Sequence, residues 1–130
     1  MFKPFPMISI RAKDGTIHHI SVGHITEITI YNKKTCVRVI DKPMIIPSES
    51  IEQIVELVKQ AGGILLEVED KSGTMHYVMA CNIVRIDVLP KGAVMIHTWP
   101  ISPRASDSMI MDVKTSIETI MQQLDALRRQ

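Results

Sequence analysis

The chain has 130 residues, of which 45% are hydrophobic and 22% are charged, as expected of a globular protein. Its 15 basic and 14 acidic residues leave a formal net charge of +1, which argues against a general nucleic-acid binder but leaves a local basic patch open. No apolar run approaches the roughly 18 residues that would span a bilayer, and the first residues do not resemble a signal peptide. We therefore expect a cytoplasmic protein that does not contact membranes and whose expected partner is not a nucleic acid.

The first half of the chain predicts a set of short strands followed by one helix. Alternating and β-branched residues favour strands at 7–12, 16–22, 25–31, 35–40 and 44–46. Asp14-Gly15 is a strong hairpin turn between the first two strands, and Pro47 ends the last strand. Ser48 can cap a helix whose apolar residues recur at three- and four-residue steps, at Ile51, Ile54, Val55 and Val58. Gly62-Gly63 then ends this helix.

The second half repeats this plan, with strands expected at 64–70, 74–81, 83–89, 93–98 and 109–111 and a helix near 112–128. Shifting the chain by 58 residues aligns Asp14-Gly15-Thr16 with Ser72-Gly73-Thr74. The helix start Ser50-Ile51-Glu52 matches Ser116-Ile117-Glu118 only at a shift of 66 residues. The second copy therefore carries about eight additional residues, near 99–107.

This internal repeat predicts an α+β protein made of two tandem ββββα repeats. The first repeat covers residues 1–63, and the second covers 64–130 and carries the inserted loop near 99–107. Each repeat would form an antiparallel sheet followed by an amphipathic helix. A unit of this size buries too little surface to be stable alone, so we expect the repeats to pack as one body. Cys36 and Cys81 lie in strand-like runs without CxxC spacing and are expected to be small core residues.

Each half also resembles a known family. A strand, an Asp-Gly turn, the Ile25-x-x-Ile28 strand, a second hairpin and the Ser50-Ile51-Glu52-x-Ile54-Val55 helix resemble the FlbD-like β-meander-plus-helix proteins of bacterial flagellar operons. The duplicated arrangement, with a helix after each sheet, resembles the phage Thoeris anti-defence proteins. That resemblance implies sequestration of cyclic ADP-ribose or cyclic-nucleotide immune signals between the protomers of an oligomer. It assigns no binding residue in this sequence.

The inserted loop is the candidate ligand site. Trp99 is the single tryptophan, and the two prolines, Arg104 and Ser106 that follow it are absent from the first copy. Trp99 would stack on a base, Arg104 would donate to a phosphate and Ser106 would supply a hydroxyl partner, with His97 beside them. The alternative is a loop in which Trp99 only covers the edge of the core.

The histidines do not predict a metal site. His18 and His19 are neighbours on a strand and point to opposite faces, and no cysteine or carboxylate lies nearby at a ligand spacing. His18 and His76 are equivalent in the repeat, so a shared packing or hydrogen-bonding role explains both. The sequence also holds no phosphate-loop, dinucleotide or nucleophile motif. We therefore expect no metal, no cofactor and no enzymatic activity.

The patterns predict a non-catalytic protein that binds a small phosphate-containing molecule. The resemblance to the Thoeris anti-defence proteins implies that this molecule is an immune signal of the cyclic-nucleotide or cyclic ADP-ribose type, and that the chain is a phage anti-defence sponge in the host cytoplasm. The alternative is a small adaptor or regulatory protein that binds another protein through a sheet edge or the C-terminal helix. The long apolar stripe of that helix predicts a homo-oligomer, and its residues are Ile117, Ile120, Met121, Leu124 and Leu127.

Overall fold

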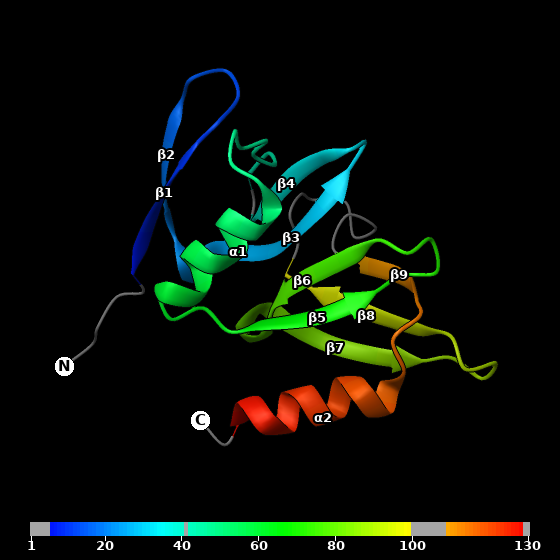
Figure 1. The fold of residues 1–130 in the computed structure, drawn as a ribbon. Helices are drawn as coiled ribbons and strands as arrows, with labels where there is room; N and C mark the ends of the chain where they lie inside the picture. The colour runs from blue at the N-terminus through cyan, green and yellow to red at the C-terminus, as the bar shows by residue number, and fades with distance from the viewer. Residues whose placement is uncertain (1–5, 41, 100–108, 129–130) are drawn as a thin grey trace.

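The computed structural model describes residues 6–40, 42–99 and 109–128, which form short strands, two helices and two 3-10 turns (Figure 1). The strands are β1 (Met7–Arg11), β2 (Ile17–Ser21), β3 (Ile25–Tyr31), β4 (Lys34–Val39), β5 (Leu65–Glu69), β6 (Met75–Met79), β7 (Ile83–Val88), β8 (Val94–Thr98) and β9 (Met109–Val113). The helices are α1 (Ile51–Gln60) and α2 (Ile117–Arg128), and the 3-10 turns are η1 (Val22–His24) and η2 (Ala80–Asn82).

The pairing of these strands contradicts the expected two tandem ββββα repeats. The described strands form a β1-β2 hairpin, a four-stranded sheet of order β4-β3-β6-β5 and a three-stranded sheet of order β7-β8-β9, all antiparallel. The central sheet therefore takes two strands from each half, and the described part of the fold is mostly β. Its halves are joined by pairing of β3 with β6, in which Ile28 lies opposite Tyr77 and Thr29 lies opposite His76.

The order of elements recurs along the chain even though the sheets do not. In each half a strand hairpin is followed by a 3-10 turn, further strands and a helix. The two 3-10 turns meet, because the buried Asn82 side chain donates hydrogen bonds to the Gly23 carbonyl at 2.9 Å and to the Ile25 carbonyl at 2.6 Å. A recurring local order is thus compatible with strands that pair across the halves.

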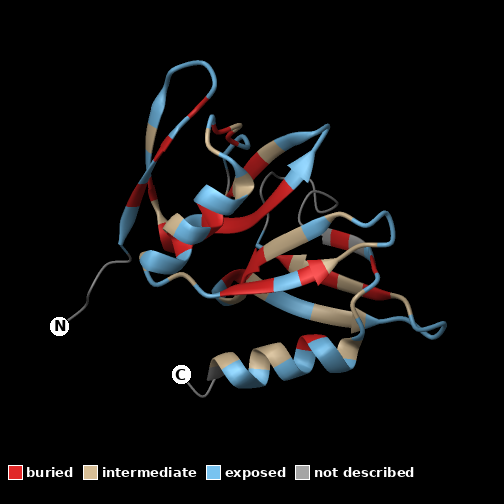
Figure 2. Ribbon diagram, in the orientation of Figure 1, coloured by how far each residue is buried: buried red, intermediate tan, exposed pale blue. Residues whose placement is uncertain are grey.

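Two clusters of buried apolar side chains hold the layers together (Figure 2). The first lies between α1, the β1-β2 hairpin and the central sheet, and includes the fully buried Ile10, Ile28 and Ile54. It also receives Leu65 and Met79 from the second half. The second cluster lies between α2, β5, β6 and the β7-β8-β9 sheet. Because side chains of the second half complete the first cluster, the halves stabilise each other by apolar burial.

The N-cap of helix α1 lies two residues later than expected. Ser50, and not Ser48, is the N-cap, and its hydroxyl accepts a hydrogen bond from the Gln53 N–H at 3.2 Å. The Gln53 side chain returns the interaction by accepting from the Ser50 N–H at 2.9 Å, which completes a capping box. The Ser48 hydroxyl instead donates to the Arg11 carbonyl at 3.1 Å and ties the helix approach to β1.

Replacement of Ser50 by alanine should lower the free energy of unfolding by about 1 kcal/mol, because the orphan N–H of Gln53 loses its acceptor. Urea denaturation followed by circular dichroism measures this change. The control is Lys59→Ala on the exposed face of the same helix, which should change stability by less than about 0.5 kcal/mol. Equal stability of the Ser50→Ala variant and the native chain would rule out the capping box.

The second helix starts later than the expected residue 112. Residues 109–113 form β9, and Asp112 adopts a left-handed backbone conformation with φ of 53° inside it. Helix α2 then lies along β5: the Thr115 hydroxyl accepts from the Glu69 N–H at 2.8 Å. The Gln123 side chain accepts from the Glu67 N–H and donates to the Glu67 carbonyl, both at 3.0 Å. These side chains satisfy the β5 edge, which the central sheet would otherwise leave open.

Two further observations concern the cysteines and membranes. Cys36 is buried in β4 as expected, whereas Cys81 is exposed in η2, so its expected place in the core is wrong. The chain direction changes at η2, and the residue that turns inward there is Asn82. Within the described residues, neither helix is long and apolar enough to cross a membrane.

Candidate functional site

Three hairpin turns line one side of the molecule. The β3-β4, β5-β6 and β7-β8 turns all point to the right in Figure 1. Strand pairing makes them neighbours: Thr29 near the end of β3 lies opposite His76 near the start of β6, and Asp70 forms a bridge to Val113. Val113 in turn pairs with Val94, directly after the β7-β8 turn. The sheets therefore bring turns from distant parts of the sequence into one row.

This row carries exposed lysines, which we call the lysine edge: Lys33, Lys34, Lys71, Lys91 and Lys114. Each turn contributes at least one of them, and Lys114 follows β9. Of the acidic residues nearby, Glu69 lies 3.7 Å from the Lys114 ammonium, and the Asp70 carboxylate accepts from the N–H groups of Ser72 and Thr74. Asp112 is exposed beside Lys71, whose N–H donates to the Asp112 carbonyl at 2.8 Å. The lysine edge is thus locally basic although the whole chain is nearly neutral.

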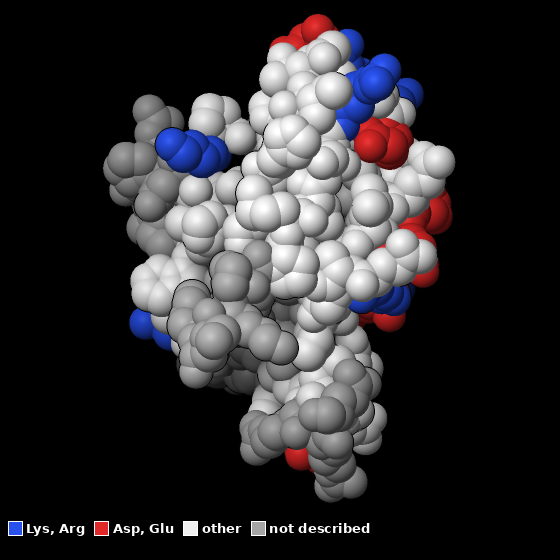
Figure 3. Space-filling model, turned by 90° about the vertical axis from the view of Figure 1, so that its left-hand side faces the viewer, with Lys and Arg blue, Asp and Glu red and all other residues white. Residues whose placement is uncertain are grey.

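One other exposed surface, on α1, is acidic. The exposed side of α1 carries Glu52 and Glu56 around a shallow depression that Glu49 also lines. Figure 3 shows the side away from the lysine edge, where the described atoms in the middle are uncharged and charged side chains lie toward the periphery. Charge is therefore distributed asymmetrically over the described surface.

A chain of charged side chains lies behind the β5-β6 turn. The His76 ring bonds the Glu27 carboxylate through Nδ1 and the Asp70 carboxylate through Nε2, each at 2.8 Å. Glu27 is buried, and its other oxygen lies 3.1 Å from the Arg38 Nε in an ion pair without hydrogen-bond geometry. These contacts connect β4, β3, β6 and the turn that carries Lys71. They fix that turn to the centre of the sheet.

The pKa values of His76 and Asp70 are shifted in opposite directions. Burial disfavours the charged His76 ring, but its hydrogen bonds to Glu27 and Asp70 outweigh burial and raise its pKa above the ordinary 6.5. Burial likewise opposes ionisation of Asp70, yet the hydrogen bonds from Ser72, His76 and Thr74 lower its pKa from 3.8 to about 2. Both shifts favour an imidazolium held between carboxylates. No described carboxylate bonds His18 in this way, so the repeat-equivalent histidines do not share a role.

Two residues of the expected ligand site, His97 and Trp99, lie on or beside the β7-β8-β9 sheet. His97 is on β8, where its Nε2 bonds the Asp87 carboxylate at 2.8 Å and its side chain is 15% exposed. Trp99 follows β8, is 53% exposed and donates its backbone N–H to the Asn82 carbonyl. Arg104 and Ser106 lie outside the described residues. Whether these four residues form a site stays a prediction.

The described His, Cys, Asp and Glu side chains form no group of three or more that could hold a metal ion.

Comparison with known proteins gives one likeness. No family model and no curated protein matches the chain. A solved structure does match: the LytTr DNA-binding domain of a protein described as a methyl-accepting/DNA response regulator from Bacillus cereus. The match covers 95% of this chain and 98% of that domain, with a TM-score of 0.61 and 10% sequence identity. The two chains share a fold.

This likeness corrects several expectations from the sequence. The fold is LytTr-like, and neither the FlbD-like repeat nor the Thoeris anti-defence family is supported. The expected sponge for a small immune signal is therefore wrong, and the adaptor alternative gains no support. The exclusion of nucleic acids as partners is wrong as well, because the matching domain binds DNA. The error came from using net charge, which does not report where the charges lie.

The lysine edge was missed although its signal is visible in the sequence. Lys33, Lys71 and Lys91 each occur in a turn, next to Asn32, before Ser72-Gly73 and before Gly92. A lysine in every one of these turns is a pattern, but only the strand pairing places the turns in one row. Glu27 and His76 were also missed as a pair, because 49 residues separate them along the chain.

Proposed function

We propose that this chain is a non-catalytic DNA-binding protein, of the kind that serves in gene regulators, and that the lysine edge faces the DNA backbone. The observation that carries the proposal is the shared fold with a LytTr DNA-binding domain over nearly the whole length of both chains. The position of the lysines supports it independently of that likeness. Exposed ammonium groups on adjacent turns suit the phosphates of a duplex, which lie along its surface at regular intervals.

The polar chain behind the β5-β6 turn supports the same assignment. Asp70 accepts hydrogen bonds from the N–H groups of Ser72 and Thr74 and from the Ser72 hydroxyl, so the conformation of the turn is fixed before any ligand arrives. A preorganised turn loses less conformational entropy when Lys71 meets a phosphate. The acidic face of α1, by contrast, would repel a duplex, so that face is not a candidate for contact with DNA.

The lysine edge is tested with a double charge reversal, Lys71→Glu with Lys91→Glu. Fluorescence anisotropy of a labelled mixed-sequence duplex should show affinity at least about tenfold weaker than for the native chain, a change of about 1.4 kcal/mol. The slope of log affinity against log salt should also become shallower by about 1 for each lost phosphate contact.

The matched control is Lys42→Glu with Lys59→Glu, which changes the net charge equally but places both reversals away from the lysine edge. This variant should keep an affinity within about threefold of the native value at moderate salt, where long-range effects are screened. Equal losses in the two double variants would mean that only overall charge matters, and the assignment of the lysine edge would fail.

A further inference from the structure

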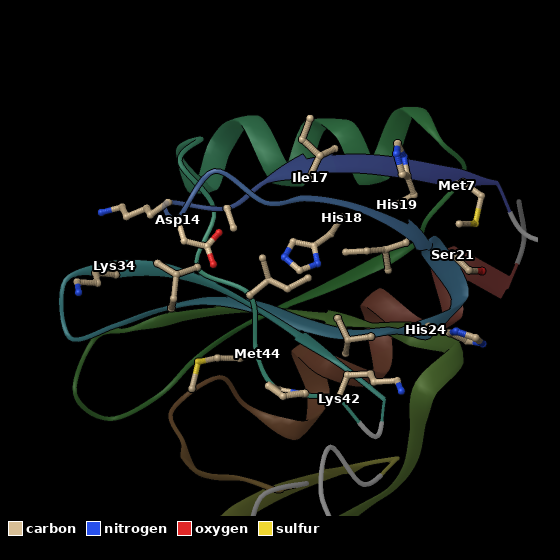
Figure 4. A pocket seen from close by; sticks show the side chains of 17 residues that line it. Met7, Asp14, Ile17, His18, His19, Ser21, His24, Lys34, Lys42 and Met44 are labelled. Atoms are coloured by element: carbon tan, nitrogen blue, oxygen red, sulfur yellow. The ribbon is translucent and has the colours of Figure 1, made fainter.

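A separate groove runs along the β1-β2 hairpin (Figure 4). Its volume is about 1120 Å³, and it lies between β2 on one side and the segment 42–46 with β4 on the other. At one end the Lys13 N–H donates to the Ile46 carbonyl at 3.0 Å and joins the two walls. The exposed apolar side chains Met7, Ile17 and Met44 line it. Of the lysine edge only Lys34 lies here, so this is a second surface of the molecule.

The groove follows the free edge of β2. All five residues of the strand, Ile17 to Ser21, line it. Alternate side chains of a strand point to opposite faces, so a groove that meets every residue must lie along the backbone edge. In the described part of the chain β2 pairs only with β1. The edge of β5 is covered by Thr115 and Gln123 and that of β4 is bridged by Ile45, but the described residues place no strand on this edge of β2.

A corresponding strand of this chain, β6, shows how such a strand edge can pair with a further strand. Strand β6 occupies the same place as β2 in the order of elements, since each is the second strand of a hairpin and precedes a 3-10 turn. The edge of β6 away from its hairpin partner holds β3. In that pairing β3 supplies the glutamate, Glu27, that bonds His76 at 2.8 Å. The residue of β2 that corresponds to His76 is His18, and its ring points into the groove (Figure 4).

The charges around the groove favour acidic groups. Lys13, Lys34 and Lys42 line it together with His18, His19 and His24. The one described carboxylate among the lining residues is Asp14, which accepts a hydrogen bond from the Thr16 N–H at 2.9 Å within its own turn. That hydrogen bond lowers the pKa of Asp14, which marks the carboxylate as already engaged. An incoming segment therefore meets basic side chains above an apolar floor.

We propose that the groove receives an extended segment of a partner protein, with alternating acidic and apolar residues, as an additional antiparallel strand on β2. Backbone hydrogen bonds along a five-residue strand, about 17 Å long, would give affinity, and an acidic side chain facing His18 and the lysines would give specificity. A second copy of this chain fits less well. Its strand β7, which pairs only with β8 among the described strands, has Arg85 at the position that corresponds to Glu27, so it would bring a cation to the basic groove.

The test uses the full chain and the capped synthetic peptide Thr-Val-Glu-Ile-Glu-Val-Thr, labelled with fluorescein. Anisotropy should show saturable binding with a Kd below about 1 mM, and the amide signals of His18, His19 and Ile20 should shift in ¹⁵N spectra. Two altered peptides serve as controls: lysine in place of glutamate, and N-methylation of alternate backbone amides. Each should weaken binding at least about tenfold, because the first removes charge attraction and the second removes strand pairing.

Variants of the protein separate this groove from the DNA surface. Lys13→Glu with Lys42→Glu should weaken peptide binding about tenfold while the spectrum stays dispersed, whereas Lys71→Glu with Lys91→Glu should leave it unchanged. The proposal is overturned if the N-methylated peptide binds equally well or the shifted amides lie outside β2. It is also overturned if duplex DNA displaces the peptide, or if light scattering shows a dimer that Lys13→Glu with Lys42→Glu dissociates. Loss of DNA binding alone would leave the groove intact.

Discussion

Replacement of Glu27 by alanine is expected to lower the free energy of unfolding by about 3 kcal/mol, as measured by urea denaturation near neutral pH. Glu27 is buried and is the shared partner of two cationic groups, at 3.1 Å from Arg38 Nε and 2.8 Å from His76 Nδ1. Its removal leaves Arg38 without a counter-charge at the junction of β3, β4 and β6, and leaves His76 with Asp70 as its remaining carboxylate partner. Loss of one member of a buried charge pair typically costs about 3–5 kcal/mol, and partial exposure of Arg38 favours the lower end of that range.

The control for this variant is Glu67→Ala, since that glutamate is exposed on β5 and the interactions of its residue with Gln123 involve only backbone atoms. We expect a change below about 0.5 kcal/mol there. A Glu27→Ala variant as stable as the control would show that the buried chain of charges does not hold the central sheet together.

The stability of the native chain should also depend on pH through His76. Its pKa in the folded state lies above the ordinary 6.5, so the imidazolium contributes its full stabilisation below about 6.5 and loses it as pH rises through the folded-state pKa. The native chain should therefore become less stable on that upward titration. The His76→Gln variant should show a flatter dependence over the same window. Parallel curves for the two proteins would contradict the shift.

The second large effect is expected at Asn82, where replacement by aspartate should cost about 3 kcal/mol or more. The Asn82 amide donates to the carbonyls of Gly23 and Ile25 and joins the two 3-10 turns. An ionised aspartate has no donor and would face two carbonyl oxygens in a buried site, which combines lost hydrogen bonds with an unpaired buried charge.

Urea denaturation at two pH values makes this test specific. The Asn82→Asp variant should recover part of its stability in mild acid, because a protonated carboxyl can donate one hydrogen bond. The matched control is Asn32→Asp in the exposed β3-β4 turn, where φ is 51° and both residue types are tolerated. A similar small loss at both positions would mean that the contact between the 3-10 turns contributes little.

Local sequence signals located most hairpins and helices but not their partners. The Asp14-Gly15 turn joins β1 and β2 where alternation and turn chemistry predicted a hairpin, because both signals act between neighbouring residues. The pairing of β3 with β6 depends instead on which apolar faces meet in the assembled core. Alternating patterns specify a face but not a neighbour, so two separate repeats and one shared sheet fit the same sequence.

The ends of the helices show the same limit on a smaller scale. Ser48 and Ser50 are both suitable caps, and the choice depends on the Arg11 carbonyl, which binds the Ser48 hydroxyl. Residues 112–116 contain no strong helix breaker. Val113 nevertheless pairs with β8 as part of β9, and α2 starts only at Ile117. In both cases a partner distant in sequence decides between local options.

The net charge of the whole chain gave no sign of the candidate site, because it sums charges that lie on different surfaces. Lysines on separate turns and glutamates on α1 nearly cancel in the net charge of +1, although the fold places them on different sides of the molecule. A turn lysine such as Lys71 or Lys91 is by itself only a solvated charge. It becomes part of a candidate interface through the antiparallel pairing that brings its turn beside the others.

The most direct test of the DNA-binding assignment is a titration of a labelled mixed-sequence duplex with the native chain at salt concentrations from about 50 to about 200 mM. Fluorescence anisotropy should show saturable binding at the lowest salt. The affinity should fall steadily as salt rises, with a slope in log units of about −0.9 for each phosphate that a lysine of this edge neutralises. Absence of binding at about 50 mM salt, or an affinity that does not change with salt, would contradict the account.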